Sequence, residues 1–332
     1  MSCTNKRHIL EIEELSVSFL QYENDRSSRQ VELPVISRLS VSVHEGEIVA
    51  VVGSSGSGKS LLAHAILGML PYNAKVGGQM YFDGELLTAE KMKELRGNKI
   101  AFVPQSTTYL DPLMKVGEQV SQSRKNAARR QRQRSLFARY GLGKDVDNKY
   151  PFECSGGMTR RVLLTSALMD EPELIIADEP TPGMDLVLAK KSMEDFRAFA
   201  DEGHGVLLIT HDIELALEVA DRVAVFYAGT TIEEAPVTDF ASEETLRHPY
   251  TKALWRAMPQ NGFEPLPGVQ PYVKDMPQGC PFGPRCSMYS EKCRGDVPMR
   301  RVGCATVRCM QYKGEPLAVE AHHAHYGTGT NK

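Results

Sequence analysis

The sequence lacks any long apolar run: among its 332 residues, no segment approaches the about 18 consecutive apolar residues that a membrane-spanning helix needs. The N-terminal stretch MSCTNKRHILEIEEL also lacks the apolar core of a secretory signal peptide, so we expect the chain to stay in the cytosol. Strong charge is missing as well, since the formal net charge is −3. No global basic field therefore points to nucleic acid as a partner.

Cysteine is scarce outside one short segment. Of the seven cysteines, five fall between Cys280 and Cys309. In a cytosolic protein, such a group favours metal or iron–sulfur ligation over disulfides. The hydrophobic content of 42% is that of a globular protein, and the length allows one large domain plus a small one.

The stretch GSSGSGKS, residues 53–60, is the strongest motif in the chain. It follows the apolar run 48–52 and precedes LLAHAILGML, which places it where a buried strand turns into a helix. Its glycines let successive backbone N–H groups point at a phosphate, and the helix adds its positive N-terminal end. Lys59 would reach the β and γ phosphates, and Ser60 would offer its hydroxyl to Mg²⁺. We therefore predict a nucleoside triphosphate site formed by Gly53, Ser54, Ser55, Gly56, Ser57, Gly58, Lys59 and Ser60.

The region before this motif predicts a β layer. Residues 8–50 alternate apolar and polar positions, as in ILEIEELSVSF and ISRLSVSVHEGE, which indicates antiparallel strands with one solvated face. The polar stretch QYENDRSSRQVELP between them is predicted to be a loop. Phe19 or Tyr22 is a candidate for stacking on an adenine ring, with core packing as the alternative for Phe19.

After the phosphate loop, we expect a helix that ends near Pro71 and a hairpin around Asp83 and Gly84 in QMYFDGELL. KIAFVPQ is then an apolar strand that ends in Gln105, whose amide can bind Mg²⁺ or its water. Residues 115–150 are predicted to be helical, and their many arginines are interpreted as a solvated helix face.

A second anion site is predicted at Ser155-Gly156-Gly157. Ser155 is well placed to cap the helix TRRVLLTSALM, and the two glycines expose backbone N–H groups at its start. One chain rarely needs two such different phosphate sites. We therefore interpret the second as serving the nucleotide of another subunit.

Two further apolar strands end in polar residues. Residues 174–177 lead into Asp178, which can hold magnesium through water, and Glu179, which can orient or deprotonate the water that attacks the γ phosphate. Adjacent carboxylates at a strand end are costly to bury without a cation, which favours magnesium nucleotide. Residues 205–210 lead into His211, which we interpret as a contact to the γ phosphate.

In this order, these residues resemble an ATP-binding cassette (ABC) subunit over about residues 8–240. The resemblance assigns the phosphate loop as Walker A, Asp178 as the Walker B aspartate and Glu179 as the catalytic glutamate. It further implies roles for the Q-loop residue Gln105, the signature residues Ser155, Gly156 and Gly157, the D-loop residue Asp185 and the switch residue His211.

The resemblance also implies a fold class. It is α/β, the P-loop NTPase fold of ABC ATPases, with a parallel sheet core, an antiparallel β layer and a helical subdomain. We expect the ABC domain to span residues 1–240 and a small cysteine-rich C-terminal extension to span residues 241–332. The family further implies a head-to-tail dimer, with ATP held between one subunit's Walker A loop and the other's signature.

The signature departs from the family pattern. Cys154 stands where the family usually has Leu, and Thr159 and Arg160 replace more usual residues on the first helical turn. None of these changes removes a group that touches phosphate or water, so we expect hydrolytic competence at this chain's own Walker side.

The C-terminal segment HPYTKALWRAMP, LPGVQPYV and GCPFGPRCSMYSEKC resembles the extension of dipeptide, oligopeptide and nickel importer ATPases. Cys280, Cys286 and Cys293 have five and six residues between neighbours, and two later cysteines compete as a fourth ligand. The subfamily's RC pair implies Cys309, which leaves Cys304 spare. Four thiolates suit a 4Fe–4S cluster, with zinc or free thiols as alternatives.

The function implied by the resemblance is ATP hydrolysis that powers an importer, most of all for di- or oligopeptides. Partners would be a second, different ABC ATPase subunit, two transmembrane permease subunits and an extracytoplasmic solute-binding protein, at the cytoplasmic face of the membrane. Alternatives are a nickel or metallophore importer, a regulator without transport, or a soluble ABC ATPase acting on nucleic acid. Only 94 residues separate Lys59 from Cys154, too few for the coiled-coil insertion of DNA-repair relatives. The histidines of the tail EAHHAHYGTGTNK are interpreted as part of a flexible tail, with nickel buffering as the alternative.

Overall fold

The computed structural model describes residues 6–22, 30–54, 56–122 and 126–316. Its strands are β1 (His8–Tyr22), β2 (Gln30–His44), β3 (Glu47–Gly53), β4 (Ala74–Phe82), β5 (Glu85–Leu86), β6 (Ile100–Val103), β7 (Leu174–Asp178), β8 (Gly205–Ile209), β9 (Arg222–Tyr227), β10 (Thr230–Pro236), β11 (Arg300–Val302), β12 (Ala305–Val307) and β13 (Glu315–Pro316). Its α-helices are α1 (Lys59–Ile66), α2 (Ala89–Leu95), α3 (Val116–Ser121), α4 (Ala127–Arg139), α5 (Gly156–Ala167), α6 (Leu186–Asp201), α7 (Ile213–Val219) and α8 (Pro249–Arg256).

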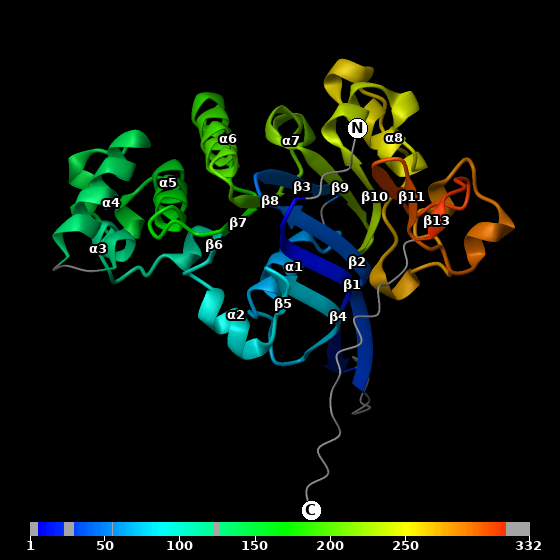
Figure 1. Ribbon diagram of the computed structural model, residues 1–332, viewed down its shortest axis with the longest axis horizontal. Helices are drawn as coiled ribbons and strands as arrows, with labels where there is room; N and C mark the ends of the chain where they lie inside the picture. Colours follow the sequence, from blue (N-terminus) through cyan, green and yellow to red (C-terminus); the bar gives the residue numbers. More distant parts are fainter. Residues whose placement is uncertain (1–5, 23–29, 55, 123–125, 317–332) are drawn as a thin grey trace, which may run out of the picture.

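Two sheets form the body. The larger has the strand order β13-β11-β12-β10-β9-β3-β8-β7-β6, and the smaller has the order β2-β1-β4-β5. Strands β9, β3, β8, β7 and β6 pair in parallel, whereas every pairing of the smaller sheet is antiparallel. Figure 1 shows α3, α4 and α5 grouped at one end of the molecule and β11 and β13 at the other. The predicted parallel core, antiparallel layer and helical subdomain are therefore confirmed.

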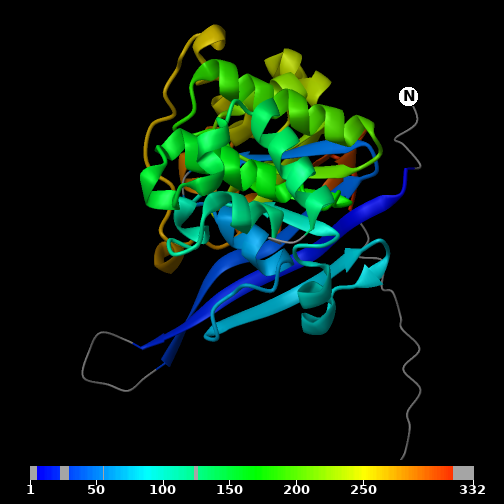
Figure 2. The same cartoon turned by 90° about the vertical axis from the view of Figure 1, so that its left-hand side faces the viewer.

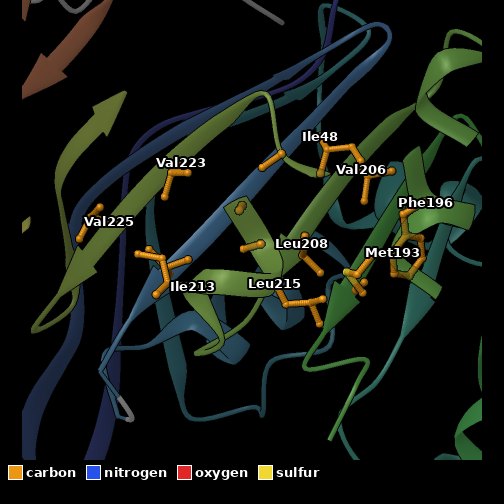
Figure 3. Packing of buried hydrophobic residues seen from close by; sticks show 14 of the residues in the cluster. Ile48, Met193, Phe196, Val206, Leu208, Ile213, Leu215, Val223 and Val225 are labelled. Atoms are coloured by element: carbon orange, nitrogen blue, oxygen red, sulfur yellow. The ribbon is translucent and has the colours of Figure 1, made fainter. Parts of the chain in front are cut away.

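The core strand β3 is buried along its whole length, which explains its continuous apolar sequence. Because side chains alternate along a strand, Ile48 joins one hydrophobic cluster while Val49 joins the other. The first cluster includes Met193 and Phe196 of α6, which pack on Val206 and Leu208 of β8 (Figure 3). The second cluster fills the space between the parallel strands and the antiparallel layer, which lies to one side of the helices in Figure 2. Parallel β3 is therefore fixed from both faces, directly before the phosphate loop.

Of three local predictions, the hairpin is confirmed, whereas the end of the first helix and the length of the loop in the β layer are wrong. The hairpin around Asp83 and Gly84 is confirmed, because β4 and β5 pair antiparallel and both turn residues have positive φ. The expected end of the first helix near Pro71 is wrong: α1 ends at Ile66, and Gly68 with φ 62° turns the chain away. The loop expected over residues 21–34 is also too long. Strand β1 continues to Tyr22, and β2 begins at Gln30, which pairs with Tyr22.

The expected helical stretch 115–150 is interrupted. Helix α3 ends at Ser121, where Gln122 adopts the left-handed conformation, and α4 starts only at Ala127, capped by Asn126. The segment 144–148 forms a 3₁₀ helix rather than a continuation of α4. A left-handed residue cannot extend an α-helix, so the charge pattern alone could not reveal this break.

The C-terminal segment continues the main sheet instead of folding apart from it. Strand β12 pairs antiparallel with β10, and β11 pairs with both β12 and β13. Arg308, only 5% exposed, donates to the carbonyls of Arg38, Thr231 and Val297, which ties the extension to β2 and β10. Within the described ranges, none of the helices combines the length and the apolar character that crossing a bilayer requires.

Candidate functional site

The predicted site residues follow neighbouring parallel strands. Asp178 pairs with Ile209 of β8, which in turn pairs with Val51 of β3. The ends of β3, β8, β7 and β6 therefore lie along one edge of the sheet, where the carboxyl ends of parallel strands form ligand sites. The phosphate loop follows β3, His211 follows β8, Glu179 follows β7 and Gln105 follows β6. The fold thus brings these residues to one edge.

The phosphate loop is shaped by its glycines. Gly53 has φ 154°, and a Cβ there would lie 2.2 Å from the carbonyl oxygen of Phe226, so no other residue fits. Gly58 has φ 92° and directly precedes α1. A Cβ on Gly56, at φ 78°, would meet nothing within 4 Å, which leaves open space in front of the loop. Ser55, which we predicted as part of this site, lies outside the described residues.

Lys59 is folded into the loop. Its side chain is 7% exposed, and its ammonium donates to the carbonyls of Gly53 at 2.8 Å and Ser54 at 3.0 Å. Burial lowers the pKa of Lys59, while the carboxylates of Glu179 and Asp178 raise it. The ammonium therefore lies within the field of the carboxylates of Asp178 and Glu179, close to where the β and γ phosphates would bind.

The buried polar atoms beside Lys59 fit a divalent cation. Asp178 is 2% exposed, and its Oδ1 has no hydrogen-bond partner among the residues that the structure describes. Burial raises the pKa of Asp178, and a hydrogen bond with Ser60 lowers it. An unpaired buried carboxylate oxygen is costly unless a cation approaches it. The predicted Mg²⁺ site at Asp178 and Ser60 therefore fits the donors that this edge provides.

Glu179 is held on several sides. Its Oε2 lies 2.8 Å from His211 Nδ1 and accepts from the Thr210 hydroxyl at 3.4 Å. Its backbone has φ 47°, in the left-handed region that non-glycine residues rarely adopt, and its N–H donates to Ile209. Such strain persists where the surroundings fix it, as at catalytic sites. The side chain of Glu179 is 8% exposed, and its contact with the exposed His211 fixes the orientation of the carboxylate.

Arg160 is a contact that the sequence did not predict. Its Nη1 donates to the backbone carbonyl of Glu179 at 2.9 Å, and burial lowers the pKa of its guanidinium while Glu179 raises it. In the sequence, Arg160 stands out only as a departure from the family's usual signature. That unusual residue is the one feature of the sequence that could have drawn attention to this contact. In the structure, Arg160 joins α5 to Glu179, the residue that follows β7.

The start of α5 is exposed. Ser155 accepts from Met158 N–H at 3.3 Å and caps the helix, as predicted, and both Ser155 and Gly156 are exposed. A Cβ on Gly157 would lie 3.4 Å from the Gly183 carbonyl, so α5 begins against the turn that precedes α6. Asp185 is also exposed and caps α6 by accepting from Leu188 N–H at 3.1 Å. These groups therefore face outward, available to a second subunit.

The three other residues named in the prediction are Gln105, Phe19 and Tyr22. Gln105 is exposed just beyond β6. Phe19 of β1 lies opposite Leu33 of β2 and packs against the second hydrophobic cluster. Tyr22 is 66% exposed, and its hydroxyl accepts a hydrogen bond from the Gln30 side chain. Adenine stacking by Phe19 stays a prediction.

The four cysteines predicted as ligands share one cavity. The residues that line it include Cys280, Cys286, Cys293 and Cys309, together with His248, Met288 and Tyr289. Cys304 is not among the residues that line it. Gly279 makes this possible, because a Cβ there would lie 2.1 Å from the Cys293 carbonyl, to which Cys280 N–H donates.

Burial disfavours the thiolate form of three of these cysteines. Burial raises the pKa of Cys280 and Cys286, and raises that of Cys309 to about 11. Among the described residues, no group of three or more His, Cys, Asp or Glu side chains could hold a metal ion as it stands. The donor set matches a four-thiolate site, but its present geometry does not form one.

Comparison with known families gives two matches. The model described as "ABC transporter" matches residues 36–182, which include the phosphate loop, the signature and Asp178. The model described as "Oligopeptide/dipeptide transporter, C-terminal region" matches residues 232–293, which include three of the cysteines that line the cavity.

Curated relatives match along most of the chain. The dipeptide transport ATP-binding protein DppD of Haemophilus influenzae is 33% identical over 93% of this chain and 98% of its own length. DppD of Escherichia coli is 35% identical over 87% of this chain and 92% of its own length. The oligopeptide transport ATP-binding protein OppD of Mycobacterium tuberculosis is 35% identical over 86% of this chain and 48% of its own length.

Solved structures agree with the fold. The ATP-binding cassette MJ0796, described as a dimer in a post-hydrolysis state bound to ADP and Pi, superposes with a TM-score of 0.60 at 26% identity. The match covers 69% of this chain and 98% of that one. With the phosphate loop, the carboxylate edge and the capped signature helix in one arrangement, this chain belongs to the ABC transporter family and is an ABC ATPase.

Proposed function

We propose that this chain is the ATP-hydrolysing subunit that powers an importer of di- or oligopeptides. The observation that carries the chemistry is the Glu179–His211 pair, 2.8 Å apart, beside the unpaired buried oxygen of Asp178. Relatives named for dipeptide transport, 33% and 35% identical over most of their own lengths, support the cargo. Their names favour peptides over nickel or a metallophore.

Each residue at the sheet edge has a task in this proposal. Backbone N–H groups of the loop and Lys59 would bind the β and γ phosphates. Asp178 and Ser60, together with Gln105, would hold Mg²⁺, which when bound neutralises phosphate charge. Glu179 would orient the attacking water or take its proton, and His211 would aim that carboxylate and contact the γ phosphate.

The outward-facing groups suit a shared site. Ser155 and Gly156 are exposed, so they would complete the nucleotide site of a second ATPase subunit, which we propose to be a different chain. Asp185 would lie at the same interface. Two permease subunits and an extracytoplasmic solute-binding protein would complete the importer, with this chain on the cytoplasmic face of the membrane. The domain division at residues 240 and 241 remains part of this proposal.

The cargo is tested on the assembled importer. Copurified with its permease subunits and reconstituted in vesicles, the complex is expected to hydrolyse ATP several-fold faster when its binding protein and a peptide are added. Stimulation is measured by phosphate release with a dipeptide, an oligopeptide, Ni²⁺ and double-stranded DNA in parallel. Stimulation by Ni²⁺ alone would reverse the cargo assignment, and stimulation by DNA without permeases would revive the soluble alternative.

We propose further that the four cysteines hold a 4Fe–4S cluster. Their position around one cavity supports this, because four cysteine thiolates are the usual ligands of such a cluster. Ligation would require deprotonation of thiols whose pKa burial has raised, so binding should release protons.

Cysteine variants test the cluster directly. Purified without oxygen, the protein is expected to contain about four iron atoms and absorb near about 400 nm, as clusters held by cysteine do. Cys309→Ser should lose the iron because it removes a cavity thiol, whereas Cys304→Ser should keep it. Iron and acid-labile sulfide analysis measures both. A colourless protein with one equivalent of zinc, or equal loss in the two variants, would contradict the proposal.

A further inference from the structure

The C-terminal extension touches the phosphate loop itself. Gln270, 216 residues beyond Ser54 in sequence, accepts a hydrogen bond from the Ser54 hydroxyl at 2.5 Å through its Oε1. The same oxygen accepts from the N–H of Ala228 at 3.3 Å. Ala228 directly follows β9, whose Phe226 pairs with Gly53. Gln270 thus bridges Ser54 of the phosphate loop and the end of β9, the strand that supports the loop.

A second residue of the extension reaches the same serine. Tyr250 of α8 is 5% exposed, and hydrogen bonds with Ser54 lower the pKa of its phenol while burial, the larger effect, raises it. Its ring centroid lies 4.5 Å from that of Tyr227, at the end of β9. Ser54 is therefore held by two side chains from a segment that begins only after the cassette has ended.

Ser54 is also where the internal bonds of the loop converge. Its carbonyl accepts from Lys59 at 3.0 Å and from Ser57 N–H at 3.3 Å. A shift of Ser54 would move the carbonyl that positions Lys59 and the N–H groups that follow. The loop contains three glycines with positive φ, whose conformational freedom must be lost before phosphate binds.

The segment that carries Gln270 is itself clamped. Arg285 donates to the carbonyls of Pro267 at 3.0 Å and Leu266 at 3.3 Å, and to the Tyr227 hydroxyl at 3.1 Å. Gly268 has φ 80°, and a Cβ there would lie 3.5 Å from Arg285 Nε, so the chain runs close over the guanidinium. The clamp fixes residues 266–270 against β9, which allows Gln270 to hold Ser54 rather than follow it.

We infer that Gln270 is a positioning residue for ATP: it holds Ser54 so that the phosphate loop is ordered before nucleotide arrives, and the extension thereby sets ATP affinity. The inference rests on the proposed binding of ATP at this loop. Preorganisation improves affinity by reducing the entropy lost on binding. Gln270 touches no reacting atom, so its effect should fall on nucleotide affinity and not on the hydrolytic step.

Variants of Gln270 in the assembled importer test this. Gln270→Ala is expected to raise the KM for ATP about fivefold, the value of one net hydrogen bond, with kcat changed less than about twofold. A fluorescent ATP analogue should show the same weakening in its Kd. The matched control is Gln260→Ala, which removes an exposed glutamine of the same extension and should leave the KM for ATP unchanged.

A double-mutant cycle separates positioning from simple attachment of the extension. If Gln270 acts through Ser54, then adding Gln270→Ala to the Ser54→Ala variant should weaken ATP binding no further. Additive effects, an unchanged or lowered KM, or a fall in Tm with normal KM would overturn the inference. Failure of the wild-type complex to bind ATP would instead refute the proposed function.

Discussion

Replacing Glu179 with glutamine is expected to lower kcat for ATP hydrolysis by about 100-fold or more, the usual contribution of a general base. The amide keeps the size of the carboxylate and its hydrogen bond from Thr210, but it cannot take a proton from water. ATP binding should survive, because the phosphate loop, Lys59 and Asp178 are unchanged. Trapped nucleotide should hold this subunit and its partner together, and size-exclusion chromatography with radiolabelled ATP measures both effects.

The matched control is Glu214→Gln on α7. Glu214 is exposed and lies just beyond His211 in the chain, so the variant removes one negative charge near the same sheet edge without touching the site. It should hydrolyse ATP at the wild-type rate. Full turnover in the Glu179 variant would remove that residue from the chemistry and leave water activation to another group.

The phosphate loop and the helix cap could be predicted from sequence because each depends on the backbone conformation of a few consecutive residues. Gly53 and Gly58 adopt the positive φ values that the motif requires, and Ser155 caps α5 as its position predicts. The carboxylate edge was readable for a similar reason: each apolar strand is followed at once by a polar residue, and parallel strands place their ends together. Asp178 and Glu179 are the clearest example.

Helix and loop boundaries were less readable because the competing signals are close together. The segment AILGML holds a glycine, and Pro71 follows it three residues later. The proline predicts a helix end near residue 71, whereas Gly68, with its positive φ, ends α1 first. Similarly, the polar character of residues 21–34 suggested a loop, although Gln30 pairs with Tyr22, since an exposed antiparallel edge accepts polar side chains.

Contacts between residues far apart in the chain could not be predicted from the sequence alone. Arg160 could be read as an unusual residue in the signature, but its bond to the Glu179 carbonyl depends on how α5 packs beside the end of β7. Gln270 carries no motif and has no periodic neighbour that marks it. Arg160 connects α5 to the end of β7, and Gln270 connects the C-terminal extension to the phosphate loop. Such couplings appear only when distant segments are placed together.

Lys59→Ala is the second large effect that we expect, and it should remove ATP binding rather than catalysis. The ammonium now donates to the carbonyls of Gly53 and Ser54, and it would exchange these for the β and γ phosphates. Loss of a charge-assisted hydrogen bond to phosphate should weaken binding by about 100-fold. Wild-type protein should melt at a higher temperature with Mg²⁺ and ATP, and the variant should lose this shift.

Two further variants separate the charge from the packing of the lysine stem. Lys59→Met keeps an aliphatic chain in a site that is 7% exposed, so it should lose the ATP-induced shift while destabilising the free protein less than alanine does. Lys190→Ala removes a half-exposed lysine that pairs with Glu218 on the outer helices and should behave as wild type. If Lys59→Met bound ATP normally, the backbone N–H groups would suffice to hold the phosphates. The buried ammonium would then serve only to close the empty loop.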